Sequence, residues 1–594
     1  IFNDQAEVRP ALVSLASKLM SVGLKVRVSK CVAYSPQASL SPLSFPTSEE
    51  LNSVDENTAI RIVPCDEGFK LLGAFVGSDA FILEEHDSCV HDFQSALNRL
   101  FLLQENPQVA FLLLRFCVNQ KLFHLLRSAP PRLTRNMASR VDHLVNEALM
   151  KLVGIPQVEA PTAGTPIAEW PTAFIKCRLP GSYGGLGVSS LSAVAEAAFL
   201  GGLAASWKTL RPFFTNDMAA TLKHDFAAVL LGIMQLSLPS AIHPNLLSYL
   251  TSRWSSLSKR RETLIPAVDT WSHLSLAELM PLMSFQVVDS ICMRMANTNK
   301  LQHLLSKIIS CSLHGSVLSA ISNPFTALSQ YRVARHLSGG CNEAMLWTSA
   351  VPTSPDMIIA PAQFRILVAQ ALGNPLPGFA LIQHSRCTCD KSLGHEGYHL
   401  LSCYRTYAHD KVVKVIQEMC RSTGLVSEVE PVGLMSGEHR PDIVVPNLRA
   451  DGKSYLGDFA SVDPVRRSSL TSSWYIPGFA ANGRDQQKRQ AYAGHFNEGA
   501  FEMLPLIMET TGRMHIGFRR FLAEVATFAS KHLPTGGVGQ HRFRSRFLKF
   551  WKTRIVATFL KALATSAMQT QQAIVDRSRR NRAILLEANT NPWA

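Results

Sequence analysis

The chain has 594 residues and a mass of 65.4 kDa. That length exceeds what one hydrophobic core organises and predicts about three or four domains. Hydrophobic residues make up 46% and charged residues 18% of the chain, an ordinary globular composition that excludes wholesale disorder. The formal net charge of +14 favours polyanionic partners such as nucleic acid.

Twelve cysteines are spread singly along the chain, apart from a cluster at Cys387, Cys389 and Cys403. No N-terminal signal peptide is recognisable, so we expect reduced thiols rather than disulfides. The longest stretch without a charged side chain, Phe226 to Ser252, is broken by prolines and serines and predicts buried helices rather than a transmembrane segment. No membrane partner is expected. Because the chain opens at Ile1 without a methionine, we expect a fragment of a longer product.

Residues 1–85 predict a small α/β domain. Apolar residues recur at helical spacing from Pro10 to Val22, and strand-like stretches follow at Gly23–Val28 and Phe69–Gly77. The sequence Gly-Leu-Lys-Val-Arg-Val-Ser-Lys-Cys, ending at Cys31, and the later Leu-Leu-Gly-Ala-Phe-Val-Gly resemble the end of a reverse transcriptase palm domain. The Tyr-x-Asp-Asp segment that holds the polymerase metals of that family does not occur in the chain. We therefore expect a palm remnant without polymerase activity.

Residues 86–345 predict a helical region, because long runs such as Phe93–Leu126 and Val287–Leu305 are apolar at helical spacing. The glycine-rich stretch Gly184–Gly187 lacks the strand and the lysine of a nucleotide-binding loop, so we interpret it as a tight turn between helices. The region resembles the thumb and connector that follow a palm domain. No residue pattern in it points to catalysis.

A cluster of cysteine and histidine lies in residues 346–404, which we interpret as a linker carrying a zinc knuckle. Cys387, Cys389, His399 and Cys403 offer three thiolates and one imidazole, the ligand types that tetrahedral Zn²⁺ prefers. The step from His399 to Cys403 places both side chains on one face of a helical turn. His395 is the alternative fourth ligand. The single residue between the first two cysteines departs from the commoner spacing of two.

Residues 405–535 alternate between helical and strand-like patterns. A helix at Ala408–Ser422 is followed by three strands, a helix, a buried strand and a last helix, at Leu425–Val432, Pro441–Val445, Ser454–Val462, Asp485–Phe496, Met503–Met508 and Ile516–Lys531. This order, α-β-β-β-α-β-α, matches the core of the PD-(D/E)xK nuclease fold, which restriction-like endonucleases share.

The polar stretch Asn447–Lys453 predicts a hairpin turn between two of these strands. If the hairpin is centred on Ala450, residues whose numbers sum to 900 face one another, which pairs Asp442 with Asp458. Facing carboxylates have Cβ atoms about 4.5–5.5 Å apart and repel unless a cation lies between them. Carboxylate oxygens, waters and a substrate phosphate suit a hard ion such as Mg²⁺, or Mn²⁺ in its place. The pair therefore predicts a metal-dependent site for phosphodiester cleavage.

A lysine completes such a site, because it stabilises charge on the phosphate or orients the attacking water. In the common motif it lies two residues after the second acid, but that position is Ala460, and Lys488 on the next helix is the nearest candidate. A lysine displaced to that helix, preceded by a knuckle and a helix bearing a histidine, resembles the restriction-like endonuclease of non-LTR retrotransposons. The matching residues, in order, are Cys387–Cys403, His409, Arg440-Pro441-Asp442, Asp458 and Lys488.

Several residues near the acidic pair have alternative interpretations. His409 either contacts a substrate phosphate or caps its helix, and Arg440 is expected to contact nucleic acid. Glu430 either completes the metal shell or is an edge-strand carboxylate. Glu509 is interpreted as structural.

Residues 536–594 predict a basic helical tail that binds nucleic acid. Between Gln540 and Arg582 there are eleven Lys or Arg and one acid, Asp576. Aromatic residues interleave with the cations, which is typical of surfaces that combine phosphate contacts with base stacking. The aromatic residues are Phe543, Phe547, Phe550, Trp551 and Phe559, and the expected phosphate-binding residues are Arg542, Arg544, Arg546, Lys549, Lys552 and Arg554. A solvated helix face is the alternative.

The resemblance implies a multidomain, mainly helical chain whose α/β endonuclease nicks target DNA so that the exposed 3′ end primes reverse transcription. The expected partners are target DNA, the element RNA and an upstream polymerase domain of the same polyprotein, acting in the nucleus. The alternative is a noncatalytic nucleic-acid-binding module with a zinc knuckle, or a decayed copy of the element. Gln487, where an acid would assist catalysis, fits the decayed copy.

Overall fold

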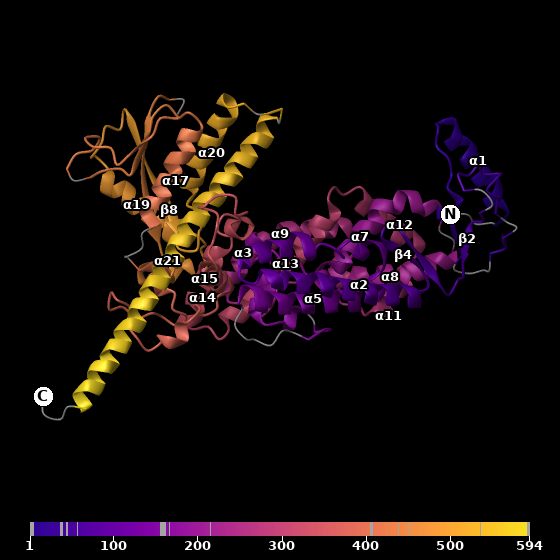
Figure 1. Ribbon diagram of the computed structural model, residues 1–594, viewed down its shortest axis with the longest axis horizontal. Helices are drawn as coiled ribbons and strands as arrows, with labels where there is room; N and C mark the ends of the chain where they lie inside the picture. Colours follow the sequence, from indigo (N-terminus) through magenta and orange to yellow (C-terminus); the bar gives the residue numbers. More distant parts are fainter. Residues whose placement is uncertain are drawn as a thin grey trace.

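The structure is a computed structural model that describes residues 5–35, 40–42, 45–55, 58–154, 162–165, 167–213, 216–403, 408–437, 439–448, 451–534, 536–537 and 539–590. Within these ranges the side chains of residues 5, 168, 213–221 and 581–590 are not described. Figure 1 shows an elongated molecule, in which a helical body lies between a small N-terminal unit and a C-terminal lobe that carries the main sheet.

The helical body spans residues 79–322, in agreement with the helical periodicity of the sequence. Helix α7 lies inside it and contacts α4, α5, α12 and α13, and Gly184 and Gly187 adopt left-handed φ angles of 73° and 72° in the turn that precedes α7. The helices are α2 (Asp79–Leu100), α3 (Pro107–Leu113), α4 (Leu125–Ser128), α5 (Pro131–Val153), α6 (Thr172–Arg178), α7 (Leu191–Leu210), α8 (Asn216–Met234), α9 (Pro244–Leu264), α10 (Val268–Trp271), α11 (Leu276–Leu279), α12 (Phe285–Ala296) and α13 (Leu301–Ser322).

Among the described residues, α13 is the one unbroken helix long and apolar enough to cross a membrane, and a bent pair at Leu276–Leu282 and Phe285–Ala296 passes the same test. Half of the most apolar window of α13 is buried inside the protein, as in the core helix of a globular domain. These features do not amount to a clear transmembrane segment.

The N-terminal unit holds α1 (Val8–Ser21), a parallel pair of β1 (Val32–Tyr34) with β2 (Arg61–Val63), and an antiparallel pair of β3 (Gly68–Leu71) with β4 (Ala74–Gly77). Two strand predictions are wrong in detail. Residues 24–27 are irregular and lead into a 3-10 turn at Val28–Lys30. The stretch Phe69–Gly77 folds back on itself, because Leu72 and Gly73 both take left-handed φ angles, as a type I′ hairpin turn requires.

The C-terminal lobe is built around a four-stranded sheet of order β5-β6-β7-β8, in which β7 pairs antiparallel with β6 and parallel with β8. Its elements are α14 (Ala327–Gly339), α15 (Pro361–Leu372), α16 (His399–Ser402), α17 (Ala408–Ser422), β5 (Glu428–Val429), β6 (Ile443–Val445), β7 (Ser454–Val462), α18 (Arg467–Ser473), α19 (Phe479–Tyr492), β8 (Phe501–Glu509), α20 (Ile516–His532) and α21 (Gln540–Thr590).

The predicted order of elements in residues 405–535 is observed with one addition, the short helix α18. Helix α17 and strand β7 have the bounds that the sequence predicts, whereas α19 begins at Phe479 rather than at Asp485. Strand β5 is shorter than predicted, because Glu430 takes a left-handed φ of 52° and Pro431 has no N–H to donate to a neighbouring strand. Helix α19 covers one face of the sheet through a cluster that includes Leu456 and Tyr492.

Helix α21 crosses the whole lobe rather than forming a separate tail. It contacts α15, α16, α17 and α20, and Figure 1 shows it running diagonally past these elements. Its middle is buried, with Trp551 6% and Phe559 0% exposed. The prediction that all five aromatic residues of this segment are available for base stacking is therefore wrong for these two, because they pack into the protein core.

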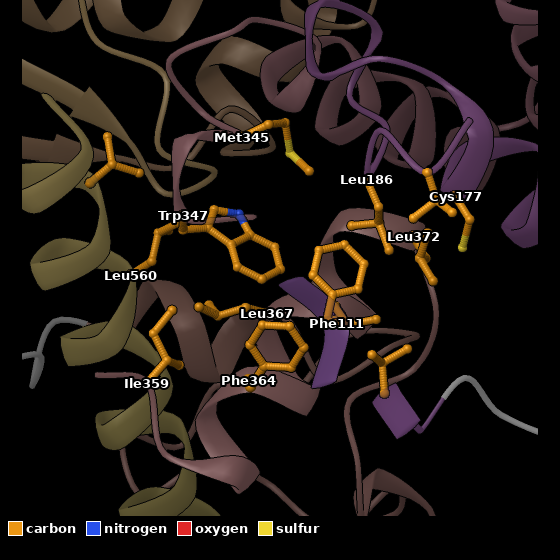
Figure 2. Packing of buried hydrophobic residues seen from close by; sticks show 14 of the residues in the cluster. Phe111, Cys177, Leu186, Met345, Trp347, Ile359, Phe364, Leu367, Leu372 and Leu560 are labelled. Carbon is orange, nitrogen blue, oxygen red and sulfur yellow. The ribbon is translucent and has the colours of Figure 1, made fainter. Parts of the chain in front are cut away.

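The region between the body and the sheet, predicted as a linker, contributes to the main core. In Figure 2, Trp347 and Phe364 lie between Phe111 of α3 and Leu560 of α21, so that side chains from all three parts of the chain converge. Trp347 and Phe364 meet edge to face with ring centroids 5.5 Å apart. The body and the lobe therefore share one continuous hydrophobic core.

The burial of α21 leads to a stability prediction. Phe559→Ala should lower the free energy of unfolding by about 3–5 kcal/mol, because it deletes a buried ring and leaves a cavity. Phe550→Ala on the same helix is the matched control, since Phe550 is 44% exposed. Urea denaturation of both variants measures the difference, and equal midpoints for the two would contradict the packed position of α21.

Candidate functional site

The hairpin of β6 and β7 has the register that the sequence predicts. Ile443 pairs with Gly457 and Val445 with Tyr455, so the residue numbers in each pair sum to 900. The backbone N–H of Asp442 donates to the carbonyl oxygen of Gly457 over 2.9 Å, which continues the ladder by one residue. Asp442 and Asp458 therefore lie at the end of the paired region as neighbours on adjacent strands.

Gly457 allows the two strands to approach closely at this point. A Cβ atom on Gly457 would lie 2.7 Å from Cγ2 of Ile443 and 3.1 Å from Cδ1 of Leu506. Because Cγ2 of Ile443 is attached to the branched Cβ, it can move aside only if the whole packed side chain rotates, which favours glycine at this position. The spacing of the acidic pair depends on this residue, although it carries no functional group.

The Asp442 carboxylate is held by two donors on the same oxygen. The backbone N–H of Phe459 donates to Oδ2 over 2.6 Å, and Nε2 of His409 lies 2.9 Å from the same atom. The hydrogen bond to Asp442 is the largest cause that raises the pKa of His409, which reaches about 9. His409 therefore contacts the acidic pair rather than only capping α17, and among the described residues Oδ1 of Asp442 is the oxygen left for a ligand.

Asp458 is the buried member of the pair, with 4% of its surface exposed. Burial raises its pKa to about 6, against the opposing effect of Lys488, and the Asp442 carboxylate raises it further. Nζ of Lys488 lies 2.5 Å from Oδ2 of Asp458, so the lysine predicted from the following helix does reach the site. One turn further along α19, the Tyr492 ring lies 5.6 Å from Nζ of Lys488.

Tyr492 is a site residue that the sequence analysis missed. Burial and the nearby Asp458 raise the pKa of its hydroxyl above the ordinary value. The sequence could have indicated Tyr492 through its position four residues after Lys488, because side chains at that spacing lie on one helix face. A neutral phenol beside Asp458 adds a hydrogen-bonding group to the site without adding charge.

Asp442 lines a cavity of about 330 Å³, together with His409, Glu430 and residues of α17 and β5, whereas the buried Asp458 is not among its lining residues. Lys414 of α17 lines this cavity and also a neighbouring one of about 340 Å³ that contains Lys411 and Lys561. These lysines were not singled out from the sequence. Glu430, interpreted either as completing the metal shell or as an edge-strand carboxylate, lines the same cavity as Asp442 and forms an ion pair with Arg440 across 2.8 Å.

The donors at the acidic pair fit a hard divalent cation. Two carboxylates of adjacent strands supply oxygen atoms of the type that hard cations bind, and the cavity gives access to that of Asp442. His409 contacts the Asp442 carboxylate and Lys488 contacts that of Asp458, so each carboxylate has a cationic neighbour within the protein. Asp442 and Asp458 are the residues that would hold Mg²⁺ or Mn²⁺.

The cysteine and histidine cluster comes together as predicted. The ligand atoms of Cys387, Cys389, His399 and Cys403 all lie within 4.8 Å of one another. Sγ of Cys389 is 3.1 Å from Nε2 of His399, and Sγ of Cys387 is 3.9 Å from Sγ of Cys403. Tetrahedral Zn²⁺, with ligand bonds of about 2.0–2.3 Å, separates its ligands by roughly 3.5–3.8 Å, so this set fits zinc.

Local folding explains why these four residues converge. The N–H of Cys387 donates to the carbonyl of Lys391 over 2.9 Å, and Asp390 takes a left-handed φ of 64°, which closes a tight turn around Cys389. His399 begins α16 and Cys403 follows its end. His395, the alternative ligand, is exposed and lies outside the cluster.

The six basic residues predicted to contact nucleic acid divide into two groups. Arg542, Arg546 and Lys549 are exposed on α21. The others bind protein atoms: Arg544 donates to Thr527, Lys552 to Glu343, and Arg554 to Asp356 and Glu418. Ion pairing within the protein neutralises Lys552 and Arg554, so the charge of the free helix face is smaller than the sequence suggests.

Comparison with known protein families finds no family model that matches the chain, and comparison with curated proteins finds no match.

The zinc cluster leads to a prediction about metal content. Protein purified without chelators should carry about one equivalent of zinc, because the four ligands close a tetrahedral site. Cys403→Ala should lose most of it and lower the unfolding midpoint, whereas Cys420→Ala, which changes a buried cysteine outside the cluster, should keep the metal. Elemental analysis measures the zinc content of the wild-type protein and of the two variants. Zinc-free wild-type protein would refute the site.

Proposed function

We propose that this chain is a metal-dependent DNA endonuclease. The observation that carries the proposal is the meeting of Asp442, Asp458 and Lys488, with two carboxylates from neighbouring strands and a lysine from the adjacent helix; Asp442 also lines an open cavity. Catalytic carboxylate pairs that share a divalent ion are a recurring solution to phosphodiester cleavage. The proposed substrate is duplex DNA and the proposed cofactor Mg²⁺ or Mn²⁺.

Each residue has a defined role in this proposal. A bound divalent cation supplies Lewis-acid polarisation of the phosphate and helps to activate water. Asp442 and Asp458 hold that cation, and His409 and the Phe459 N–H fix the orientation of Asp442. Lys488 stabilises negative charge on the phosphate or orients the water, because its ammonium group already lies at the acidic pair.

The element order of residues 405–535 supports assignment to the restriction-like endonucleases, since a helix precedes three strands, Asp442 directly precedes β6 and Asp458 lies on β7. With the knuckle upstream and the palm-like motifs near the N-terminus, the proposal extends to the C-terminal part of a non-LTR retrotransposon polyprotein. In that setting the nick exposes a 3′ end for reverse transcription in the nucleus, with target DNA, element RNA and an upstream polymerase domain as partners.

A noncatalytic nucleic-acid-binding module is the second candidate. The zinc-ligand cluster and the exposed Arg542, Arg546 and Lys549 favour it, because both features support binding without requiring the acidic pair. The two functions differ in one respect. Only the endonuclease needs Asp442 and Asp458 to be ionisable.

The decisive experiment measures nicking of supercoiled DNA with Mg²⁺. Asp442→Asn and Asp458→Asn should each abolish nicking while DNA affinity stays nearly unchanged, because binding draws on phosphate contacts elsewhere. Lys488→Ala should slow nicking by about 10²–10³-fold, the usual cost of removing one preorganised charge-stabilising group. Glu428→Gln, an exposed carboxylate on β5, is the matched control and should nick at the wild-type rate.

Nicking that persists in both Asp variants would eliminate this site. Wild-type protein that binds DNA but never nicks it, with Mg²⁺ or Mn²⁺, would favour the binding module or a decayed copy.

The exposed face of α21 leads to a separate prediction about salt. Replacing Arg542, Arg546 and Lys549 together by Ala should reduce the slope of log affinity against log salt concentration by about 0.9 for each DNA phosphate that these side chains neutralise. A control variant replaces Lys208, Lys259 and Arg260, which are exposed on the helical body. Titrations at several salt concentrations compare the three proteins, and an unchanged slope in the α21 variant would show that these cations are only solvated.

A further inference from the structure

A second cavity, of about 220 Å³, lies at the junction of the helical body and the C-terminal lobe. Its walls come from α6, α13, α14 and α15, and from Tyr398 just before α16. Three cationic side chains line it, Lys176, Arg332 and Arg335, and none of the described lining residues is acidic. A buried space with this lining is unusual, because buried charges are normally paired.

Lys176 is the clearest unpaired charge in the cavity. It is 4% exposed, and its ammonium group donates one hydrogen bond, to the carbonyl oxygen of Leu372 over 3.0 Å. Burial lowers its pKa to about 8, and the nearby Arg332 lowers it further. An ammonium group has three donors, so two remain for another acceptor.

Arg335 also has hydrogen-bond donors that a ligand could use. It is 6% exposed, and none of its three guanidinium nitrogens meets an acceptor in good hydrogen-bond geometry among the described residues, although Tyr331 and Asp463 lie near enough to raise its pKa against the effect of burial. Its nearest carboxylate, Asp463, lies 3.6 Å from Nη1, and its guanidinium stacks on the Tyr398 ring at 4.1 Å from the centroid. The stacking holds the guanidinium in place, and the donors remain available.

Other groups around the cavity add donors but little negative charge. His336 is 5% exposed, neither ring nitrogen has a partner in the described part of the chain, and burial lowers its pKa far below the ordinary value. Nδ2 of Asn374 also has no acceptor among the described residues. Glu396, the remaining nearby acid, is engaged by Arg332 over 3.0 Å.

We propose that this cavity binds a small tetrahedral oxyanion of the phosphate class, held by Lys176 and Arg335. Many donors facing few acceptors call for a ligand made largely of acceptor oxygens, and a phosphate offers several around one centre. The volume is below the roughly 300–1,000 Å³ of sites for drug-sized ligands, which favours a free anion over a whole nucleotide. The site is distinct from the acidic pair and does not depend on endonuclease activity.

The position of the site gives the anion a structural role. Lys176 belongs to α6 of the body, whereas Arg335 belongs to α14 of the lobe, whose end accepts hydrogen bonds from Arg513 at the carbonyls of Leu337 and Ser338. An anion between the two cations would therefore tie the body to the lobe and remove the repulsion between them.

The test uses the full chain and inorganic phosphate as the probe. Thermal unfolding is followed in potassium phosphate and in potassium chloride at equal ionic strength and pH. Phosphate should raise the unfolding midpoint in a saturable way, because it binds the folded state alone. Lys176→Met and Arg335→Gln should each lose this increase, whereas Lys208→Met, a change of the same kind at an exposed lysine, should keep it.

Two results would overturn the proposal. One is a wild-type midpoint that rises no more in phosphate than in chloride, which would mean that the cavity holds water only. The other is an increase that persists in a folded Lys176→Met or Arg335→Gln variant, which would place phosphate on the exposed basic surface. Calorimetric titration of wild-type protein with phosphate, expected to show one site, decides the matter if neither variant folds.

Discussion

Burial of the apolar face of α21 is the constraint on which the rest of the C-terminal lobe depends. The sheet is covered on one face by α19, and its other face needs α17 and α20, which α21 in turn covers. Phe459, the residue after Asp458, packs edge to face on Phe559 of α21 with ring centroids 6.0 Å apart. The last helix therefore supports the backbone that positions the acidic pair, and the same packing unites lobe and body in one core.

The sequence alone predicted the elements whose periodicity is strong, such as α17 and β7, and it predicted the hairpin register that pairs Asp442 with Asp458. Its success there has a physical reason, because a turn and a two-residue alternation fix register locally. The burial of α21 was not predictable in this way. Its cations alternate with apolar residues, and only the tertiary structure shows that Glu343, Asp356 and Glu418 neutralise two of them.

The acidic pair and the junction cavity differ in the sign of their charged side chains and in how those charges are paired. At the acidic pair, carboxylates gathered by strand pairing are contacted by His409 and Lys488, although burial still raises the pKa of Asp458. In the junction cavity, Lys176 is buried with no carboxylate partner among the described residues, and Arg335 has one at 3.6 Å, Asp463. Long-range contacts create both arrangements, which explains why residues of α6 and α14 showed no pattern in the sequence that would have associated them.

Gly457 carries no functional group, yet the close approach at this position has consequences for how the chain tolerates mutation. A side chain there would push β6 from β7 at Ile443 and separate the two carboxylates without altering either. In any related sequence that retains the proposed activity, Gly457 should therefore be retained together with the two aspartates. An intact pair of acids beside a replaced glycine would then indicate that the spacing of the carboxylates is no longer preserved.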